Sequence, residues 1–203
     1  MTTDIDLTAL DPRDRYKLLT ALIVPRPVAW VTTLSRDGVV NAAPYSFFNV
    51  FGQDPALVIL GLEHRADGSK DTTRNVEETG EFVLNLVTPD LTGPMVATAA
   101  SYPSGTSETE ALGLVTAASS RVAPPRIADA PVAFECRRTV TLQFSANRDI
   151  VVGEALAISA RDGLIDTDRM HVDWGGDYPV ARLFADRYAR LEEIERHPIP
   201  PLD

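Results

Sequence analysis

The chain has very little cysteine and no long apolar run, and each shortage excludes a class of protein. Cys136 is the single cysteine, which excludes an intramolecular disulfide and fits a reducing compartment. The apolar run ALVILGL (residues 56–62) is far shorter than a membrane span, and Glu63 ends it. The N-terminal segment carries acidic side chains where a secretion signal would have basic and then apolar ones. We therefore expect a cytoplasmic protein without a membrane segment.

Positive charge is also scarce. The 19 Lys and Arg residues are outnumbered by 29 Asp and Glu residues, which gives a formal net charge of −10. A surface of this sign argues against nucleic acids and anionic membranes as partners. It leaves the class of enzyme or binding protein open, because acidic soluble enzymes are common.

Several familiar site motifs are missing. No G-x-G-x-x-G follows a strand-like segment, so a dinucleotide site of the Rossmann type has no support. The histidines His64, His171 and His197 are far apart, and none has a ligand partner at metal-site spacing, so we expect no metal. Cys136 lies between a glutamate and an arginine and is interpreted as a small buried thiol rather than a nucleophile.

The sequence does contain a succession of strand-like segments. Residues 28–34 and 39–43 predict a hairpin around the tight-turn pair Asp37-Gly38. Further strands are predicted over residues 56–62, 82–87, 138–144 and 150–159, the last two as a long antiparallel pair. Because the early strands are joined by a hairpin rather than by helical crossovers, the pattern favours an antiparallel barrel over a doubly wound parallel sheet.

Two short helices are predicted from their capping signals. The first spans residues 12–22, begins with a proline and has Asp11 as its cap. The second is capped by Ser69 or Asp71 and ends at Gly80, in the left-handed conformation that glycine adopts at low cost.

Weaker patterns cover the rest of the chain. Residues 92–101 are a helix candidate, 102–110 predict a mobile polar loop, and 123–131 predict an irregular crossing. Apolar residues at helical spacing over 181–195 predict a terminal helix.

Three segments carry residues suited to binding, and the first is GSKDTTRN (residues 68–75). It places Lys70, Arg74 and the hydroxyls of Thr72 and Thr73 at a helix start. The unpaired N–H groups and positive partial charge of a helix start make such a segment a plausible phosphate seat. A normal capped helix with a solvated polar face is the alternative, which this segment alone favours.

The second segment is PRPVAWVTT (residues 25–33). Two prolines flank Arg26 and keep it extended, and Thr32 and Thr33 place a hydroxyl on each face of the predicted strand. An ordinary strand with a surface arginine explains this segment equally well by itself.

The third segment, NAAPYSFFNVFGQDP (residues 41–55), combines small residues, aromatic residues and asparagines without a charge before Asp54. A flat heteroaromatic ligand needs backbone at close range, aromatic walls, and side chains that can hydrogen-bond a polyol or a pyrimidine edge. The residues that supply these are Asn41, Ala42, Ala43, Pro44, Ser46, Phe47 and Asn49. The alternative is that the phenylalanines are simply core.

Taken in order, these segments resemble the flavin reductase-like family of FMN-binding split barrels. The matching stretches are residues 25–62, residues 70–87 (KDTTRNVEETGEFVLNLV) and residues 151–158 (VVGEALAI). The resemblance implies a mainly β fold, namely an antiparallel split β-barrel with Greek-key character and a few short peripheral helices. It also implies a single FMN-binding domain over 1–203, with a core of about 20–160 and a C-terminal extension over 161–203.

The resemblance also assigns the cofactor and its contacts. It implies FMN bound near the subunit interface of a homodimer, with Lys70, Asp71 and Thr72 at the phosphate end. Arg26, Pro27, Thr32 and Thr33 would lie on the adjacent strand, and residues 41–49 would line the flavin ring and ribityl chain. No catalytic side chain is assigned, because the flavin carries the chemistry.

The expected function is that of an NAD(P)H-dependent flavin reductase-type oxidoreductase. It would pass a hydride from a nicotinamide cofactor to flavin or to a further acceptor, with FMN either as a prosthetic group or as a substrate released to a partner monooxygenase. One alternative is an FMN-binding electron-transfer protein without nicotinamide turnover. Another is a non-flavin barrel that serves protein contacts.

Overall fold

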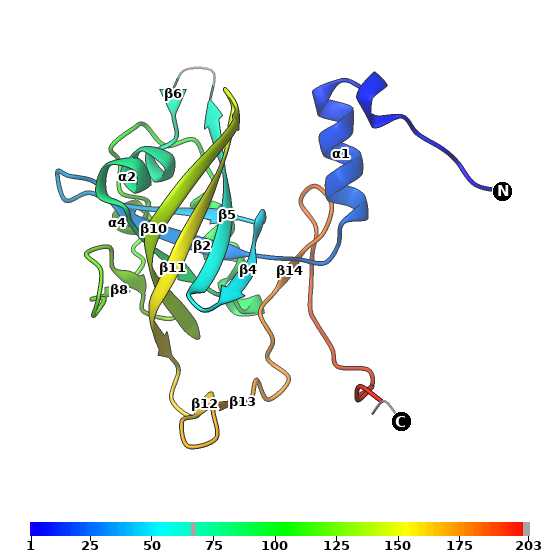
Figure 1. The fold of residues 1–203 in the computed structure, drawn as a ribbon. Coiled ribbons are helices and arrows are strands. Elements are labelled where there is room, and N and C mark those ends of the chain that lie inside the picture. Colours follow the sequence, from blue (N-terminus) through cyan, green and yellow to red (C-terminus); the bar gives the residue numbers. More distant parts are fainter. Residues whose placement is uncertain (66–67, 201–203) are drawn as a thin grey trace.

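One antiparallel sheet dominates the computed structural model, which describes residues 1–65 and 68–200 (Figure 1). Its strands are β2 (Ala29–Leu34), β3 (Val40–Tyr45), β4 (Phe48–Gln53), β5 (Ala56–Arg65), β6 (Gly68–Ser69), β7 (Glu81–Asn85), β10 (Val132–Ser145) and β11 (Arg148–Ala160). Their spatial order is β3-β2-β7-β10-β11-β5-β4, with β6 paired to β5. This non-sequential antiparallel order confirms the prediction of a mainly β fold.

The predicted strand pairs are present and mostly longer than expected. β2 and β3 form the first hairpin, with Ala29 opposite Tyr45 and Leu34 opposite Val40. Gly38 has a φ of 82° in the turn, which a residue with a Cβ adopts only at a cost. β10 and β11 form the long pair, in which β10 begins at Val132 rather than at the predicted residue 138.

The stretch over residues 41–55 builds both edges of the sheet. β3 and β4 lie at opposite ends of the strand order, yet only Ser46 and Phe47 separate them along the chain. The N–H of Gly61 in β5 donates to the carbonyl of Phe47 at 2.7 Å. The chain therefore passes directly from one edge of the sheet to the other, which brings the edges together into a barrel.

Two helices confirm the predicted pattern, with one correction. α1 (Pro12–Leu22) is capped by Asp11, whose side chain accepts hydrogen bonds from two N–H groups of the first turn. α2 (Asp71–Thr79) ends at Gly80 with a φ of 72°. The prediction that Ser69 or Asp71 caps α2 is wrong, because Lys70 occupies the cap position. A lysine side chain has no hydrogen-bond acceptor, so it leaves the N–H groups of this first turn available.

Shorter elements surround the barrel. The helical segments are η1 (Leu7–Ala9), η2 (Pro89–Leu91), α3 (Thr92–Ala97) and α4 (Glu108–Ala111), and the strands include β8 (Thr116–Ala117), β9 (Arg126–Ile127), β12 (Ile165–Asp166) and β13 (His171–Val172). α3 is shorter than its predicted range, and α4 begins inside the predicted polar loop. No helix in the described part of the chain is long and apolar enough to cross a membrane.

The predicted terminal helix over 181–195 is wrong. This segment instead forms β14 (Ala181–Arg182) and β15 (Tyr188–Ala189), which join β1 (Arg26–Pro27) in a small three-stranded sheet. An isolated helix gains most of its stability from a buried apolar face. Here Leu191 and Ile194 are 40% and 86% exposed, so the apolar positions of the pattern have no core to cover them in the chain alone.

The core packs against both faces of β2. Ala29 and Val31 belong to a cluster inside the barrel, whereas Trp30 belongs to a second cluster on the other face, as the alternation of a strand requires. Cys136 lies in the first cluster and is fully buried. Burial, assisted by the charge of Glu135, raises the pKa of the Cys136 thiol to about 12, which agrees with the interpretation of an inert thiol.

Candidate functional site

Two adjoining cavities form one groove along β3. The first, of about 650 Å³, lies between β3, the start of α2 and the segment 98–108. The second, of about 940 Å³, lies between the end of β3, α1 and the β14–β15 hairpin. Both are lined by Pro44, Tyr45 and Lys70. Their volumes are typical of cofactor and ligand sites.

The start of α2 opens into the first cavity. Lys70, Thr72 and Arg74 line this cavity, and the N-terminal end of the helix gives it positive partial charge. Thr72 is buried and accepts a hydrogen bond from the side-chain amide of Asn41 at 2.8 Å. The predicted phosphate segment and the predicted ligand wall are thus in direct contact.

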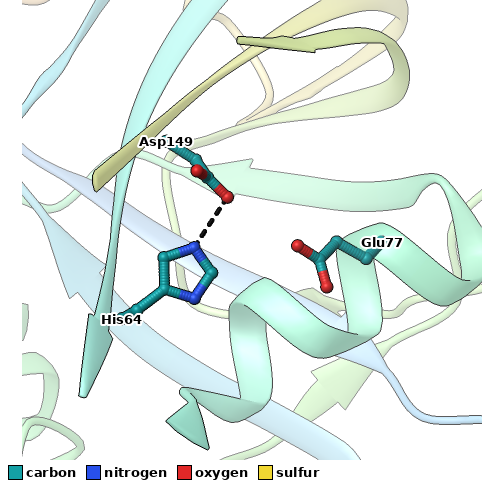
Figure 2. A group of neighbouring side chains, drawn as sticks. All are labelled: His64, Glu77 and Asp149. Atoms are coloured by element: carbon teal, nitrogen blue, oxygen red, sulfur yellow. Dashed lines mark hydrogen bonds and ion pairs between the residues drawn. The ribbon is translucent and has the colours of Figure 1, made fainter. Parts of the chain in front are cut away.

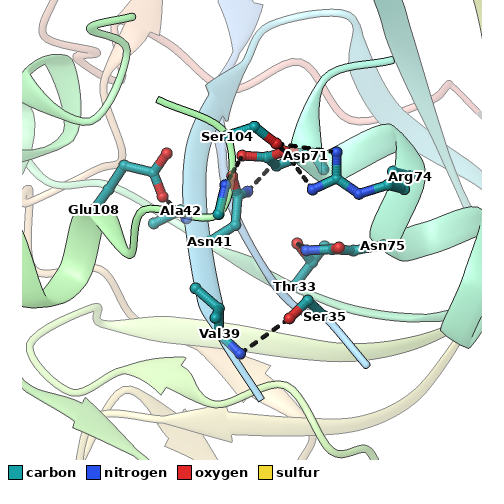
Figure 3. A network of polar contacts seen from close by, with 12 residues as sticks. Thr33, Ser35, Val39, Asn41, Ala42, Asp71, Arg74, Asn75, Ser104 and Glu108 are labelled. Carbon is teal, nitrogen blue, oxygen red and sulfur yellow. Dashed lines mark hydrogen bonds and ion pairs between the residues drawn. The ribbon is translucent and has the colours of Figure 1, made fainter. Parts of the chain in front are cut away.

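Asp71 holds the segment 102–105 against the helix start. Its carboxylate accepts hydrogen bonds from Ser104 Oγ at 2.9 Å and from the backbone N–H of Gly105 at 3.3 Å, and it forms an ion pair with Arg74 (Figure 3). Burial acts to raise the pKa of Asp71, but hydrogen bonds from Ser104 and Arg74 outweigh it and lower the pKa below its ordinary value. The Asp71 side chain is therefore occupied by protein partners.

Cationic side chains are concentrated along the second cavity. Its charged lining consists of Arg13, Lys17, Arg26, Lys70, Arg148 and Arg182 against Glu63 and Asp186. Lys70 Nζ lies 3.2 Å from Glu63 Oε2, and both side chains are partly exposed. In a chain with a net charge of −10, this groove is a local concentration of positive charge, which suits an anionic ligand.

Glu108 is a buried acid in the first cavity that the sequence pattern did not single out. Its Oε2 accepts a hydrogen bond from the backbone N–H of Ala42 at 3.0 Å (Figure 3). Burial raises the pKa of Glu108 above its ordinary value, and the nearby charge of Asp71 raises it further. Ionised Glu108 therefore opposes both folding and the binding of an anion.

We expect Glu108→Gln to stabilise the protein increasingly as pH rises. At low pH the carboxyl is neutral in the folded and unfolded chains. At a pH above the ordinary pKa of a glutamate, the Glu108 carboxyl ionises freely in the unfolded chain, whereas its ionisation in the folded chain is opposed by burial. We expect a melting temperature about 2–4 °C above wild type near neutral pH, which corresponds to on the order of 1 kcal/mol in a chain of this size.

Thermal melts of both proteins between pH 4 and 8 test this expectation, with melts of Glu110→Gln, an exposed neighbour, as the control. A constant difference across the pH range would show that the Glu108 carboxyl does not titrate with folding.

The structure brings most of the predicted site residues to the groove. The first cavity contains Asn41, Ala43, Pro44, Lys70, Asp71 and Thr72, and the second contains Arg26, Pro44, Ser46, Phe47 and Lys70. The remaining predicted residues, Pro27, Thr32, Thr33, Ala42 and Asn49, do not line either cavity. Pro27 pairs with Ala181, and Asn49 is exposed on β4.

The two threonines and Arg26 have structural partners. Thr32 Oγ1 donates to the carbonyl of Pro125, and Thr33 Oγ1 accepts from the amide of Asn75 at 3.0 Å, with both threonines fully buried. Arg26 is 8% exposed and donates to the carbonyls of Ile23 at 2.9 Å and Leu183 at 2.7 Å. Arg26 thus links the end of α1 to the β14–β15 hairpin through its hydrogen bonds, and it also lines the second cavity.

Two parts of the groove lay outside the predicted site. The segment 98–108 supplies one wall of the first cavity, and α1 supplies Tyr16 and Lys17 to the second. Neither segment carries a ligand motif, and only the long-range packing reveals their place. The polar composition of residues 102–110 is the single signal that pointed to this region.

Comparison with known proteins agrees with this geometry. The model of the flavin reductase like domain matches residues 21–181. The 2-nitrobenzoate 2-nitroreductase NbaA of Pseudomonas fluorescens is 36% identical with a TM-score of 0.89, covering 98% of this chain and 96% of that one. Nitrilotriacetate monooxygenase component B from Bacillus cereus is 31% identical with a TM-score of 0.91, covering 97% and 99%. A putative flavin reductase with a split barrel domain from Shewanella frigidimarina shares the fold at 23% identity, with a TM-score of 0.83 and coverage of 95% and 96%.

Proposed function

The chain belongs to the flavin reductase-like family, and on that premise we propose that it binds FMN in the groove and transfers a hydride from NADH or NADPH. The acceptor is free flavin or a further substrate. The observation that carries this proposal is the start of α2. The cap residue Lys70 has no side-chain acceptor for the N–H groups of the first turn, and Lys70 and Thr72 border a cavity of cofactor size.

The residues present fit this cofactor. The FMN phosphate is a dianion, which suits the N–H groups of the first turn of α2 together with Lys70. Ala43 and Pro44 offer a wall without bulky side chains for the ring, and the Asn41–Thr72 pair offers polar atoms to the ribityl chain. FMN when bound would supply the hydride-accepting centre, so the chain needs no acid–base pair of its own.

The second cavity is the proposed entry for the nicotinamide cofactor. It adjoins the first cavity at Pro44, Tyr45 and Lys70, and its arginines suit a pyrophosphate. The similarity to a monooxygenase component and to a nitroreductase supports two classes of final acceptor, namely a flavin released to a partner monooxygenase and a small nitroaromatic compound.

Steady-state oxidation of NADH and NADPH tests the proposed activity. We expect turnover with one or both nicotinamides that depends on FMN. Flavin that survives gel filtration supports a prosthetic group, whereas turnover that saturates with added flavin supports a released substrate. A yellow protein that oxidises neither nicotinamide would support the alternative of an FMN-binding electron-transfer protein.

We further propose a homodimer, and expect light scattering at micromolar concentration to give twice the mass of the chain. Val50 and Phe51 on the edge strand β4 are 72% and 67% exposed, which is unusual for adjacent large apolar side chains on a monomer. α1 also stands apart from the barrel, as Figure 1 shows. Phe51→Glu should weaken the dimer at least about tenfold, because it buries a charge in the interface.

Val115→Glu is the matched control for this variant, since Val115 is 63% exposed away from β4. A wild-type protein of monomer mass would overturn the proposed assembly.

A further inference from the structure

Three side chains that are distant in sequence meet beside α2. His64 comes from β5, Glu77 from α2 and Asp149 from β11 (Figure 2). One potential ligand atom from each residue lies within 4.8 Å of the other two. This group was not predicted from the sequence, because its members share no local spacing.

The group faces away from the groove. Asp149 pairs with Leu62 across β11 and β5, and His64 lies two residues further along β5, so both project to the same face of the sheet. Glu63 and Arg148, which line the second cavity, project to the opposite face. Arg148, a cation that borders the groove, therefore lies on the opposite face of the sheet from Asp149.

Asp149 is buried with part of its hydrogen-bonding capacity unused. Its carboxylate is 2% exposed, and Oδ2 lies 2.7 Å from His64 Nε2. Among the residues that the structure describes, no group hydrogen-bonds Oδ1. A buried carboxylate oxygen without a partner is costly unless a cation compensates it.

We propose that His64, Glu77 and Asp149 bind a divalent transition metal, with zinc as its representative. One imidazole and two carboxylates are ligands that zinc accepts, and three protein ligands leave a fourth tetrahedral position for water. The His64–Asp149 separation of 2.7 Å needs only a small expansion to admit an ion between the two atoms. Glu77 is exposed at the edge of the group, so its side chain is free to close on the ion.

The metal would have a structural role. It would join the middle of α2 to β5 and β11, and the first turn of the same helix borders the groove. A ligand that binds only the folded chain stabilises it by mass action. With free zinc at about 100 times its dissociation constant, the melting temperature should rise by about 5–10 °C.

Calorimetric titration of the chelator-treated full-length protein with zinc chloride tests the site. We expect one zinc per chain and a melting temperature that rises with zinc. Glu77→Gln should weaken zinc by at least about tenfold, since even outer partners of metal ligands contribute about 10- to 100-fold. The exposed position of Glu77 makes this variant safe for folding. His64→Gln should have a similar or larger effect.

Two control variants remove groups of the same chemistry outside the cluster. Glu78→Gln changes the next residue of α2, and His171→Gln changes an exposed histidine. Both should keep wild-type zinc affinity. Absence of stoichiometric zinc binding would overturn the proposal and leave a hydrogen-bonded His–carboxylate cluster. Equal affinity in wild type and Glu77→Gln would also overturn it, as binding at adventitious surface groups only.

Discussion

Replacing Ala43 by leucine is expected to abolish FMN binding while the barrel still folds. Ala43 is half-buried and lines the first cavity, so a larger side chain at this position projects into the space proposed for the flavin. We expect FMN affinity to fall by about 100-fold or more, because forcing extra methylene groups into occupied space costs about 1–3 kcal/mol and occasionally more. FMN titration and thermal melting of the same apo-protein sample measure the two effects separately.

The neighbouring residue provides the matched control. Ala42 is fully buried in the second core cluster, so Ala42→Leu should overpack the core and destabilise the chain by about 1–3 kcal/mol. Ala43→Leu should therefore lose FMN binding at a near-normal melting temperature, whereas Ala42→Leu should have a lowered melting temperature. A lowered melt with retained FMN affinity in Ala43→Leu would show that this side chain is core and that the flavin lies elsewhere.

Replacing Lys70 by alanine is expected to weaken FMN by about 1.5–3 kcal/mol, or about 10- to 150-fold, the contribution of a charge-assisted hydrogen bond. Lys70 sits at the cap position of α2 and lines both cavities, so it borders the proposed phosphate site. Titration of wild type and variant with FMN measures the loss.

Riboflavin separates a phosphate contact from an effect on the fold, because it lacks the phosphate. We expect its affinity to be nearly the same in wild type and Lys70→Ala. Glu63→Gln, which frees Lys70 from its ion-pair partner, should keep or slightly increase FMN affinity. Equal weakening of FMN and riboflavin in Lys70→Ala would assign Lys70 to the ring or to the fold.

Local signals in the sequence were sufficient for most of the fold. The Asp37-Gly38 turn, the glycine stop of α2 and the apolar strand patterns each depend on residues close in the chain, and all are present. The helix predicted over 181–195 was wrong, because helical spacing of apolar residues does not show whether the rest of the chain offers a core to bury them. The predicted cap of α2 was wrong by one residue, because Ser69 still pairs with β5 and Asp71 is already the first residue of the helix, which leaves Lys70 at the cap position.

The candidate site was predictable where its residues come from the two segments with local binding patterns, β3 and the start of α2. Asn41, Ala43, Lys70 and Thr72 lie together because β3 and α2 pack side by side. Thr32 and Thr33 were expected at the ligand, but each hydroxyl instead pairs with a residue distant in the chain. Glu108 and Asp149 were missed for the same reason, since their environment arises only when separate elements meet.

The most direct test of the proposed function is the anaerobic mixing of the FMN-loaded protein with NADH and, separately, with NADPH. The proposal requires that at least one of them bleaches the visible absorption of the bound flavin in a single turnover, and that Ala43→Leu, prepared with the same FMN, shows no such reaction. A flavin that stays oxidised with both nicotinamides, while a chemical reductant bleaches it, would contradict the proposed hydride transfer and leave only flavin binding.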